Sequence, residues 1–194
     1  MTRVLIDHEA PLFTFDDGPS EWTPQILDLL SAHNQRASFF LTGMYVARNA
    51  DTIRRAYADG HRIGNHAWSH RRLTALNDDE VRAEIMQTQT EIRAVLGVTP
   101  RMWRAPFFDT DDRVLKIAAE FRLRHEDANL IPEDWMATDP EALAAVILDE
   151  IGPGSIVSLH DGVPPDGGSL RCTDSRAVTV EALRLVLEAM AVRA

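Results

Sequence analysis

The chain has 194 residues, of which 45% are hydrophobic and 26% are charged, as in ordinary soluble globular proteins. This length predicts a single domain over residues 1–194 that can bury a sizeable core. The net charge is −10 and no basic stripe carries interleaved aromatic residues, so we expect no nucleic-acid partner and no binding to anionic membranes. The lone cysteine, Cys172, excludes an internal disulfide.

Targeting signals are not evident in the sequence. Residues 1–7 contain no apolar stretch of signal-peptide length, and no later segment is long enough to span a bilayer. We therefore expect a cytoplasmic protein, although a leader removed beforehand leaves the same pattern. The sequence carries no signature of an oligomeric state.

Apolar runs alternate with amphipathic stretches along the chain. The runs predict strands at residues 12–15, 37–41, 62–66, 102–106 and 155–161. Helical periodicity predicts helices at 20–33 with Ser20 as cap, 50–58, 78–96 with Asp78 as cap, 112–120, 141–151 and 180–190. Residues 126–135 are expected to be irregular, and 162–171 to form a loop rich in proline and glycine. This alternation predicts an α/β fold with a parallel sheet, wrapped like a barrel.

Two adjacent carboxylates, Asp16 and Asp17, follow the first predicted strand and precede a Gly-Pro turn. Neighbouring side chains on a regular strand point to opposite faces, but at a strand end that breaks into a turn both can face one cleft. Two touching carboxylates repel each other, so the pair requires a cation, a shared proton or full solvation. Seen alone, the motif also fits a solvated turn.

Two histidines, His66 and His70, have the spacing of one helical turn and would share a face if the segment were helical. Together with Asp17 they would form a site of two imidazoles and one carboxylate, with positions left open for water. Three protein ligands and an open position are typical of a catalytic divalent cation. We expect Zn²⁺, with Co²⁺, Ni²⁺ or Mn²⁺ as alternatives.

The remaining polar residues at strand ends suggest how water could be activated. Asp16, left free of the cation, can accept the proton of an attacking water, and Arg104 can orient it through a bidentate pair. His160, after the last predicted strand, is placed to protonate a leaving amine. Asp134 is the candidate that holds His160 protonated, with Asp127 and Asp161 as competitors for that role.

These residues lie within five ordered motifs that resemble the polysaccharide deacetylases, the NodB-homology family or carbohydrate esterase family 4. The five motifs span nearly the whole chain: Thr14-Phe15-Asp16-Asp17-Gly18-Pro19, Gly64-Asn65-His66-Ala67-Trp68-Ser69-His70, Arg104-Ala105-Pro106-Phe107, Asp134-Trp135 and Ser158-Leu159-His160-Asp161. The resemblance implies a distorted (β/α) barrel and metal-dependent removal of acetyl groups, usually N-acetyl groups on a hexosamine. An acetylated oligosaccharide or glycoside is therefore the expected substrate.

The resemblance also implies residue roles. Asp17, His66 and His70 would bind the metal, Asp16 would be the base, and His160 the acid. Arg104 would orient the base and Asp134 would tune the acid. The family pattern adds three substrate contacts: the backbone N–H of Phe107 at the oxyanion, and Trp135 and Leu159 around the acetyl methyl group. Ala67 departs from the family's usual Ser or Thr, which suggests that a hydrogen bond of that loop is missing.

Several alternatives remain open from the sequence. The same catalytic set suits a metal-dependent amidase of a small non-sugar amide, or an esterase of acetylated xylan. A site of two histidines and one carboxylate also occurs in non-haem Fe(II) oxygenases, although that reading leaves Asp16, Arg104 and His160 unexplained. A sugar-binding protein without activity is the last alternative. Trp68, Trp103 and Phe108 are candidates either for stacking on a sugar or for core packing.

Overall fold

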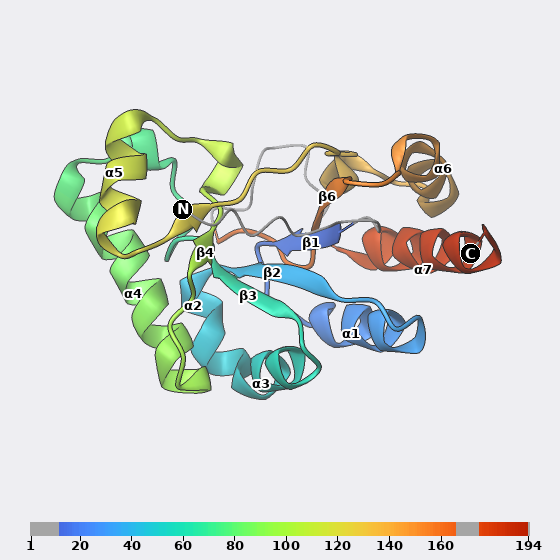
Figure 1. Ribbon diagram of the computed structural model, residues 1–194, viewed down its shortest axis with the longest axis horizontal. Coiled ribbons are helices and arrows are strands. Elements are labelled where there is room, and N and C mark those ends of the chain that lie inside the picture. Colours follow the sequence, from blue (N-terminus) through green and yellow to red (C-terminus); the bar gives the residue numbers. More distant parts are fainter. Residues whose placement is uncertain (1–11, 166–174, 194) are drawn as a thin grey trace.

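The computed structural model describes residues 12–165 and 175–193 of the chain. A six-stranded sheet forms its centre, with the strands in the order β5-β4-β3-β2-β1-β6 and every pair parallel. The sheet curls into a half-barrel, which confirms the predicted α/β class and barrel-like wrap (Figure 1). The strands are β1 (Leu12–Asp16), β2 (Ala37–Leu41), β3 (Arg62–Asn65), β4 (Met102–Trp103), β5 (Arg124–His125) and β6 (Ile156–His160).

The alternation along β1 separates the two faces of the sheet. Phe13 and Phe15 belong to the main core and are fully buried there. The intervening Thr14 and Asp16 lie on the inner side, where both accept hydrogen bonds from Arg104. Because the side-chain period of a strand is two residues, one strand supplies both the core and the polar interior of the half-barrel.

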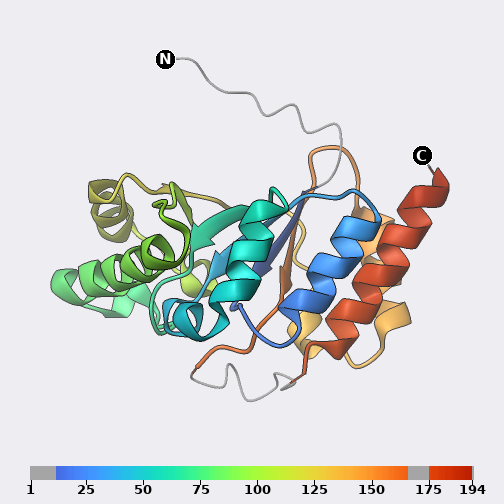
Figure 2. The ribbon, with the colours of Figure 1, turned by 90° about the horizontal axis from the view of Figure 1, so that it is seen from below.

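Helices cover the outer face of the sheet and its flank. The α-helices are α1 (Thr23–Ala32), α2 (Gly43–Val46), α3 (Ala50–Ala58), α4 (Asp78–Leu96), α5 (Asp112–Glu120), α6 (Pro140–Glu150) and α7 (Ala177–Arg193). Short 3₁₀ turns are η1 (Ala47–Asn49), η2 (Leu73–Ala75), η3 (Pro106–Phe108) and η4 (Asp134–Met136). Helices α1 and α7 lie side by side against the β1–β6 half of the sheet (Figure 2), whereas α4 and α5 build a second, smaller core around Trp103.

Residues 126–130 cross from one edge of the sheet to the other. They leave β5 and reach β6, where Leu130 pairs with Val157 in parallel register. The carbonyl groups of Glu126 and Asp127 accept hydrogen bonds from the buried guanidinium of Arg104. The segment was expected to be irregular, and it is, but it also spans the open side of the half-barrel.

Two of the predicted helix caps are wrong by a few residues. Helix α1 begins at Thr23, and the Ser20 hydroxyl instead bonds the Asp161 carbonyl and accepts the Trp22 N–H. Helix α4 is capped by Asn77 in a capping box: the Asn77 side chain accepts the Glu80 N–H, and the Glu80 carboxylate accepts the Asn77 N–H. Asn at the cap satisfies the N–H of the third helical residue, which Asp78 inside the first turn does not do.

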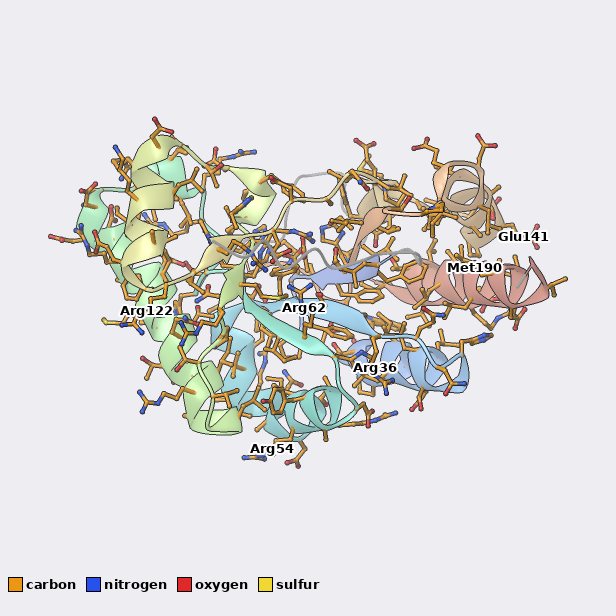
Figure 3. The ribbon with its side chains drawn as sticks, in the orientation of Figure 1. Arg36, Arg54, Arg62, Arg122, Glu141 and Met190 are labelled. Carbon is orange, nitrogen blue, oxygen red and sulfur yellow. The ribbon has the colours of Figure 1, made fainter. Side chains whose placement is uncertain are left out.

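The surface is charged, with side chains such as Arg54, Arg122 and Glu141 extending outward into solvent (Figure 3). No helix in the described ranges is long and apolar enough to cross a membrane. Cys172 and part of the predicted 162–171 loop lie outside the described residues.

Candidate active site

The carboxyl ends of the strands gather the polar residues that the sequence singled out. Asp16 ends β1 and pairs in register with His160, which ends β6. His66 and Arg104 directly follow β3 and β4. A cavity of about 380 Å³ opens over these ends, lined by Asp16, Asp17, His66, His70, Arg72, Phe107, Phe108, Ile131, Trp135, His160, Pro164 and Arg176. The strand ends therefore form one site, as expected for a parallel α/β fold.

A left-handed backbone at Asp17 turns the two adjacent carboxylates into the same cavity. Its φ is +70°, a region that few residues other than glycine adopt but that aspartate tolerates. Asp16, still in strand geometry, points to the inner face, and the reversal at Asp17 cancels the alternation that would otherwise separate them. Both residues are at most 3% exposed. The expectation that the strand end would bring both into one cleft is confirmed.

The loop 66–70 brings His66 and His70 together without a helical turn. Ala67 and His70 both have a φ of +60°, and the segment forms no helix, so the condition under which the two histidines would share a helical face is not met. The two imidazole rings nevertheless lie 5.2 Å apart, centre to centre. The convergence arises from two left-handed residues rather than from helical periodicity.

The side chains of Asp17, His66 and His70 each aim one donor atom at a common point. Asp17 Oδ1 lies 3.3 Å from Nε2 of His66 and 3.0 Å from Nε2 of His70. His66 Nδ1 lies 2.8 Å from the Arg104 carbonyl oxygen. Since a carbonyl only accepts, Nδ1 carries a proton, and in the neutral ring Nε2 is the atom left to bind a cation. Asp17 Oδ1 is buried and makes no hydrogen bond of normal geometry in the described part of the chain. This donor set fits a divalent cation.

The electrostatics of this cluster also favour a positive charge at its centre. Burial would raise the pKa of Asp17, but His70 and His66 hold that pKa well below its usual value. Burial likewise opposes charge on His66, yet Asp16 and Asp17 raise its pKa. The anionic form of Asp17 is thus maintained, which a cation ligand requires.

Glu84 on α4 anchors the loop that carries both histidines. Its carboxylate accepts the backbone N–H groups of Trp68 and Ser69, each at 2.8 Å, and the Ser69 hydroxyl at 2.5 Å. The Ala67 N–H donates a further hydrogen bond to the side-chain oxygen of Asn65. These contacts hold the loop even though Ala67 lacks the hydroxyl of the Ser or Thr that the family usually has at this position. The sequence analysis missed Glu84, although a carboxylate on the buried face of an amphipathic helix is a signal that could have revealed it.

Arg104 holds Asp16 inside the half-barrel. Its Nη1 lies 3.0 Å from Asp16 Oδ1 and 2.8 Å from the Thr14 hydroxyl, and its side chain is fully buried. The predicted bidentate pair is wrong, because Nε and Nη2 instead donate to the carbonyls of Glu126 and Asp127. The guanidinium thereby fixes Asp16 with one nitrogen and the crossing segment with the other two.

His160 is paired with Asp134, as predicted. Its Nδ1 lies 2.7 Å from Asp134 Oδ1, and its backbone N–H donates to Oδ2 at 2.9 Å. The hydroxyl of Thr179, on α7, also donates to Oδ2 at 2.7 Å. Burial lowers the pKa of His160, but the carboxylates of Asp134, Asp17 and Asp16 together outweigh that effect and raise it to about 9, with Asp134 first among them. The sequence analysis missed Thr179, which no motif marks.

The two competitors for the Asp134 role lie elsewhere. The Asp127 carboxylate is 81% exposed and lies 3.3 Å from His125 Nδ1. Asp161 is fully buried, and its Oδ2 accepts the Thr23 hydroxyl at 2.6 Å. Burial raises the pKa of Asp161 to about 7. Neither carboxylate appears among the contacts of the His160 ring in the described residues.

Of the three expected substrate contacts, Trp135 and Phe107 line the cavity and Leu159 does not. Trp135 lines the cavity with its ring 4.9 Å from that of His160, and Phe107 lines it beside His70 at 4.5 Å. Leu159 is 1% exposed and belongs to the main core, so its expected position in the cavity wall is corrected. Strand alternation explains this, because Leu159 precedes His160 and faces the opposite side of β6.

The aromatic candidates for sugar stacking also fall into residues of the core and residues of the cavity wall. Trp103 is fully buried in the second core, Trp68 is half-buried, and Phe108 lines the cavity. Only Phe108 of these three is therefore available at the site.

Comparisons with known proteins identify the family and the fold of this chain. The family model for polysaccharide deacetylase matches residues 7–125. A chitooligosaccharide deacetylase of Bradyrhizobium sp. (strain ANU 289) is 38% identical over 181 residues, covering 91% of this chain and 82% of that protein. The family 4 carbohydrate esterase from Streptomyces lividans, solved with acetate, superposes with a TM-score of 0.82 at 26% identity, over 95% of this chain and 89% of that one.

A catalytically altered relative has the same fold. A CE4 family pseudoenzyme from Bacillus anthracis superposes with a TM-score of 0.82 at 25% identity, over 96% of this chain and 62% of that one. Fold alone therefore does not establish activity, and the side chains at the strand ends carry that argument. With the matching family model and the rhizobial relative, the chain belongs to the polysaccharide deacetylase family.

Proposed function

We propose that the protein is a divalent-metal-dependent deacetylase that hydrolyses the N-acetyl group of an N-acetylhexosamine in an oligosaccharide or glycoside. The observation that carries this proposal is the convergence of Asp17, His66 and His70 on one point beside the Asp16–Arg104 pair. Further support comes from the relatives, which include chitooligosaccharide deacetylases and a peptidoglycan-N-acetylglucosamine deacetylase of Bacillus cereus.

In this proposal Asp17, His66 and His70 hold the cation, with Zn²⁺ as the first candidate because imidazole and carboxylate ligands suit it. When bound, such a cation polarises the acetyl carbonyl and acidifies water. The protein's own residues then manage the protons and the orientation of the substrate.

Asp16 accepts the proton of the attacking water, since it borders the cavity without belonging to the ligand cluster. Arg104, at 3.0 Å, orients the Asp16 carboxylate toward the cavity. His160 gives a proton to the departing amide nitrogen, and Asp134 keeps His160 charged for that step. The backbone N–H of Phe107 stabilises the developing oxyanion, and Trp135 contacts the acetyl methyl group.

Of the competing functions, only the oxygenase leaves parts of this arrangement without a role. An oxygenase with the same ligand set has no use for the Asp16–Arg104 and Asp134–His160 pairs. A small-molecule amidase or a xylan esterase uses the same groups, so substrate choice separates these functions from the proposed one.

The experiment is acetate release by protein reconstituted with each candidate metal, measured on N-acetylated oligosaccharides, biosynthetic glycosides, small non-sugar amides and acetylated xylan. We expect turnover of the N-acetylated sugars and its loss after chelation. Release from xylan alone, or from non-sugar amides alone, would overturn the substrate assignment. Full activity after chelation would overturn the metal dependence.

A further inference from the structure

Arg72 is a cation of the cavity wall that the deacetylation chemistry does not use. It follows the histidine loop by two residues and lines the same cavity as Asp16 and Asp17. Its side chain is 60% exposed, so its charge reaches the solvent that a substrate would displace.

The guanidinium of Arg72 is held in place by an aromatic ring. Its Cζ lies 4.3 Å above the centre of the Phe107 ring, and that ring packs against His70 at 4.5 Å. Stacking on Phe107 occupies a flat face and leaves the N–H edge available for a planar anion. The guanidinium is therefore fixed at a set distance from the metal-ligand cluster.

In the described residues, Arg72 has no carboxylate at hydrogen-bond distance. Its nearest carboxylate oxygen is Asp109 Oδ1, at 3.9 Å. Asp109 is directed elsewhere, because its Oδ2 accepts both the backbone N–H and the hydroxyl of Thr74. By contrast, Asp16 in the same cavity has a close cationic partner in Arg104, and Asp134 has one in His160, which lines the cavity.

We infer that Arg72 selects substrates that carry a carboxylate near the acetylated sugar, by pairing with that carboxylate at the edge of the cavity. This inference rests on the proposed function and specifies its substrate class. A local cation is needed for such a substrate, because the net charge of −10 otherwise repels anions. The Arg fork suits the two oxygens of a carboxylate.

The test uses two forms of one probe: a chitotetraose oxidised at a single C6 to the carboxylate, and the same molecule as its uncharged carboxamide. Calorimetry on cation-free protein gives the ratio of their affinities. We expect the wild type to prefer the carboxylate and Arg72→Gln to lower that preference roughly tenfold, the scale of one hydrogen bond to a charged group. Arg72→Lys, which keeps the charge and loses the fork, should fall in between.

Arg71→Gln is the matched control, because Arg71 is adjacent in sequence, is exposed and pairs with Glu80. It should leave the ratio unchanged. A wild-type ratio near one, or an unchanged ratio in Arg72→Gln, would overturn the inference. The affinity ratio is independent of turnover, so a preserved ratio with no acetate released from either probe would count against the proposed function alone.

Discussion

Asp16 and His160 are register partners on the neighbouring strands β1 and β6. In a parallel pair, side chains in register point to the same face, so the carboxylate and the imidazole enter the cavity at one level. Each has its own charged partner, Arg104 for Asp16 and Asp134 for His160. The sheet thus sets the proposed base and the proposed acid side by side, each next to a partner of opposite charge.

The pairing of His160 with Asp134 predicts an alkaline limit to activity. The pKa of His160 is raised from 6.5 to about 9, so the proton it must donate is present at neutral pH and lost above about 9. We expect kcat/KM for amide hydrolysis to fall above that value. Asp134→Asn removes the anion that opposes the effect of burial, so its limit should move to lower pH. The measurement is the pH profile of both proteins, and coincident alkaline limits would contradict the pairing.

The same shift predicts how stability depends on pH. A group whose pKa is higher in the folded state contributes stability fully below its unfolded value, near 6.5, and loses that contribution as pH rises through about 9. In denaturant unfolding measured between pH 6.5 and about 9, the free energy of unfolding of Asp134→Asn should not show this decline. A wild-type protein whose stability does not decline relative to the variant would argue against a charged His160.

Replacing His160 by alanine should separate amides from activated esters. An amine leaving group needs a proton, whereas a nitrophenolate leaves without one, so the amide rate should fall by about 10²-fold and the ester rate far less. The measurement compares N-acetyl oligosaccharides with 4-nitrophenyl acetate at the same pH. Equal losses on the two substrates would be inconsistent with an acid role for His160.

Glu84 should control the affinity of the metal site. Glu84→Ala removes the acceptor of Trp68 N–H, Ser69 N–H and the Ser69 hydroxyl, which frees the loop between the two histidines. We expect metal affinity to weaken by roughly 10–100-fold, the usual scale for groups that orient ligands. Glu84→Gln should retain most of it, because its amide oxygen can accept both N–H groups while its NH₂ donates to the hydroxyl.

Gln87→Ala, an exposed position on the same helix, is the control for effects on α4 itself. Metal titration by calorimetry, alongside denaturant unfolding, separates loop positioning from general stability. If Glu84→Ala lost stability but kept the wild-type metal affinity, Glu84 would be merely structural.

The turn after Asp17 should not tolerate a side chain at Gly18. A Cβ there would lie 2.2 Å from Asp161 Oδ2, in a buried region that cannot move aside easily. We expect Gly18→Ala to lower the free energy of unfolding by about 1–3 kcal/mol, as overpacking does. Gly152→Ala, with no atom within 4 Å of its Cβ, should stay within about 0.5 kcal/mol of wild type. Denaturant unfolding measures both, and equal effects would contradict the close packing.

The sequence predicted which residues meet, but not how the chain brings them together. Asp16, His66, Arg104 and His160 could be placed at one edge because parallel strands end on the same side of a sheet. The left-handed conformations of Asp17 and His70 have no sequence signature comparable to a glycine. His66 and His70 were therefore grouped correctly, but the sequence could not show that a loop, and not a helical turn, brings them together.

The sequence also could not predict contacts between segments that lie far apart along the chain. Glu84 and Thr179 lie on helices whose amphipathic pattern reports burial but not the partner of a buried polar group. Leu159 was misplaced because motif membership was given more weight than strand alternation. The link from Arg104 to the carbonyls of Glu126 and Asp127 depends on a crossing segment with no regular structure, which periodicity cannot predict.

The central claim, one cation held by Asp17 and two histidines with Asp16 spared as the base, is tested most directly by measuring bound metal and acetate release on the same samples. Asp17→Ala should lose both, since it removes a ligand. Asp16→Asn should keep the wild-type metal content and lose at least about 10²-fold in turnover. Full metal content in Asp17→Ala, or near-wild-type turnover in Asp16→Asn, would contradict the account.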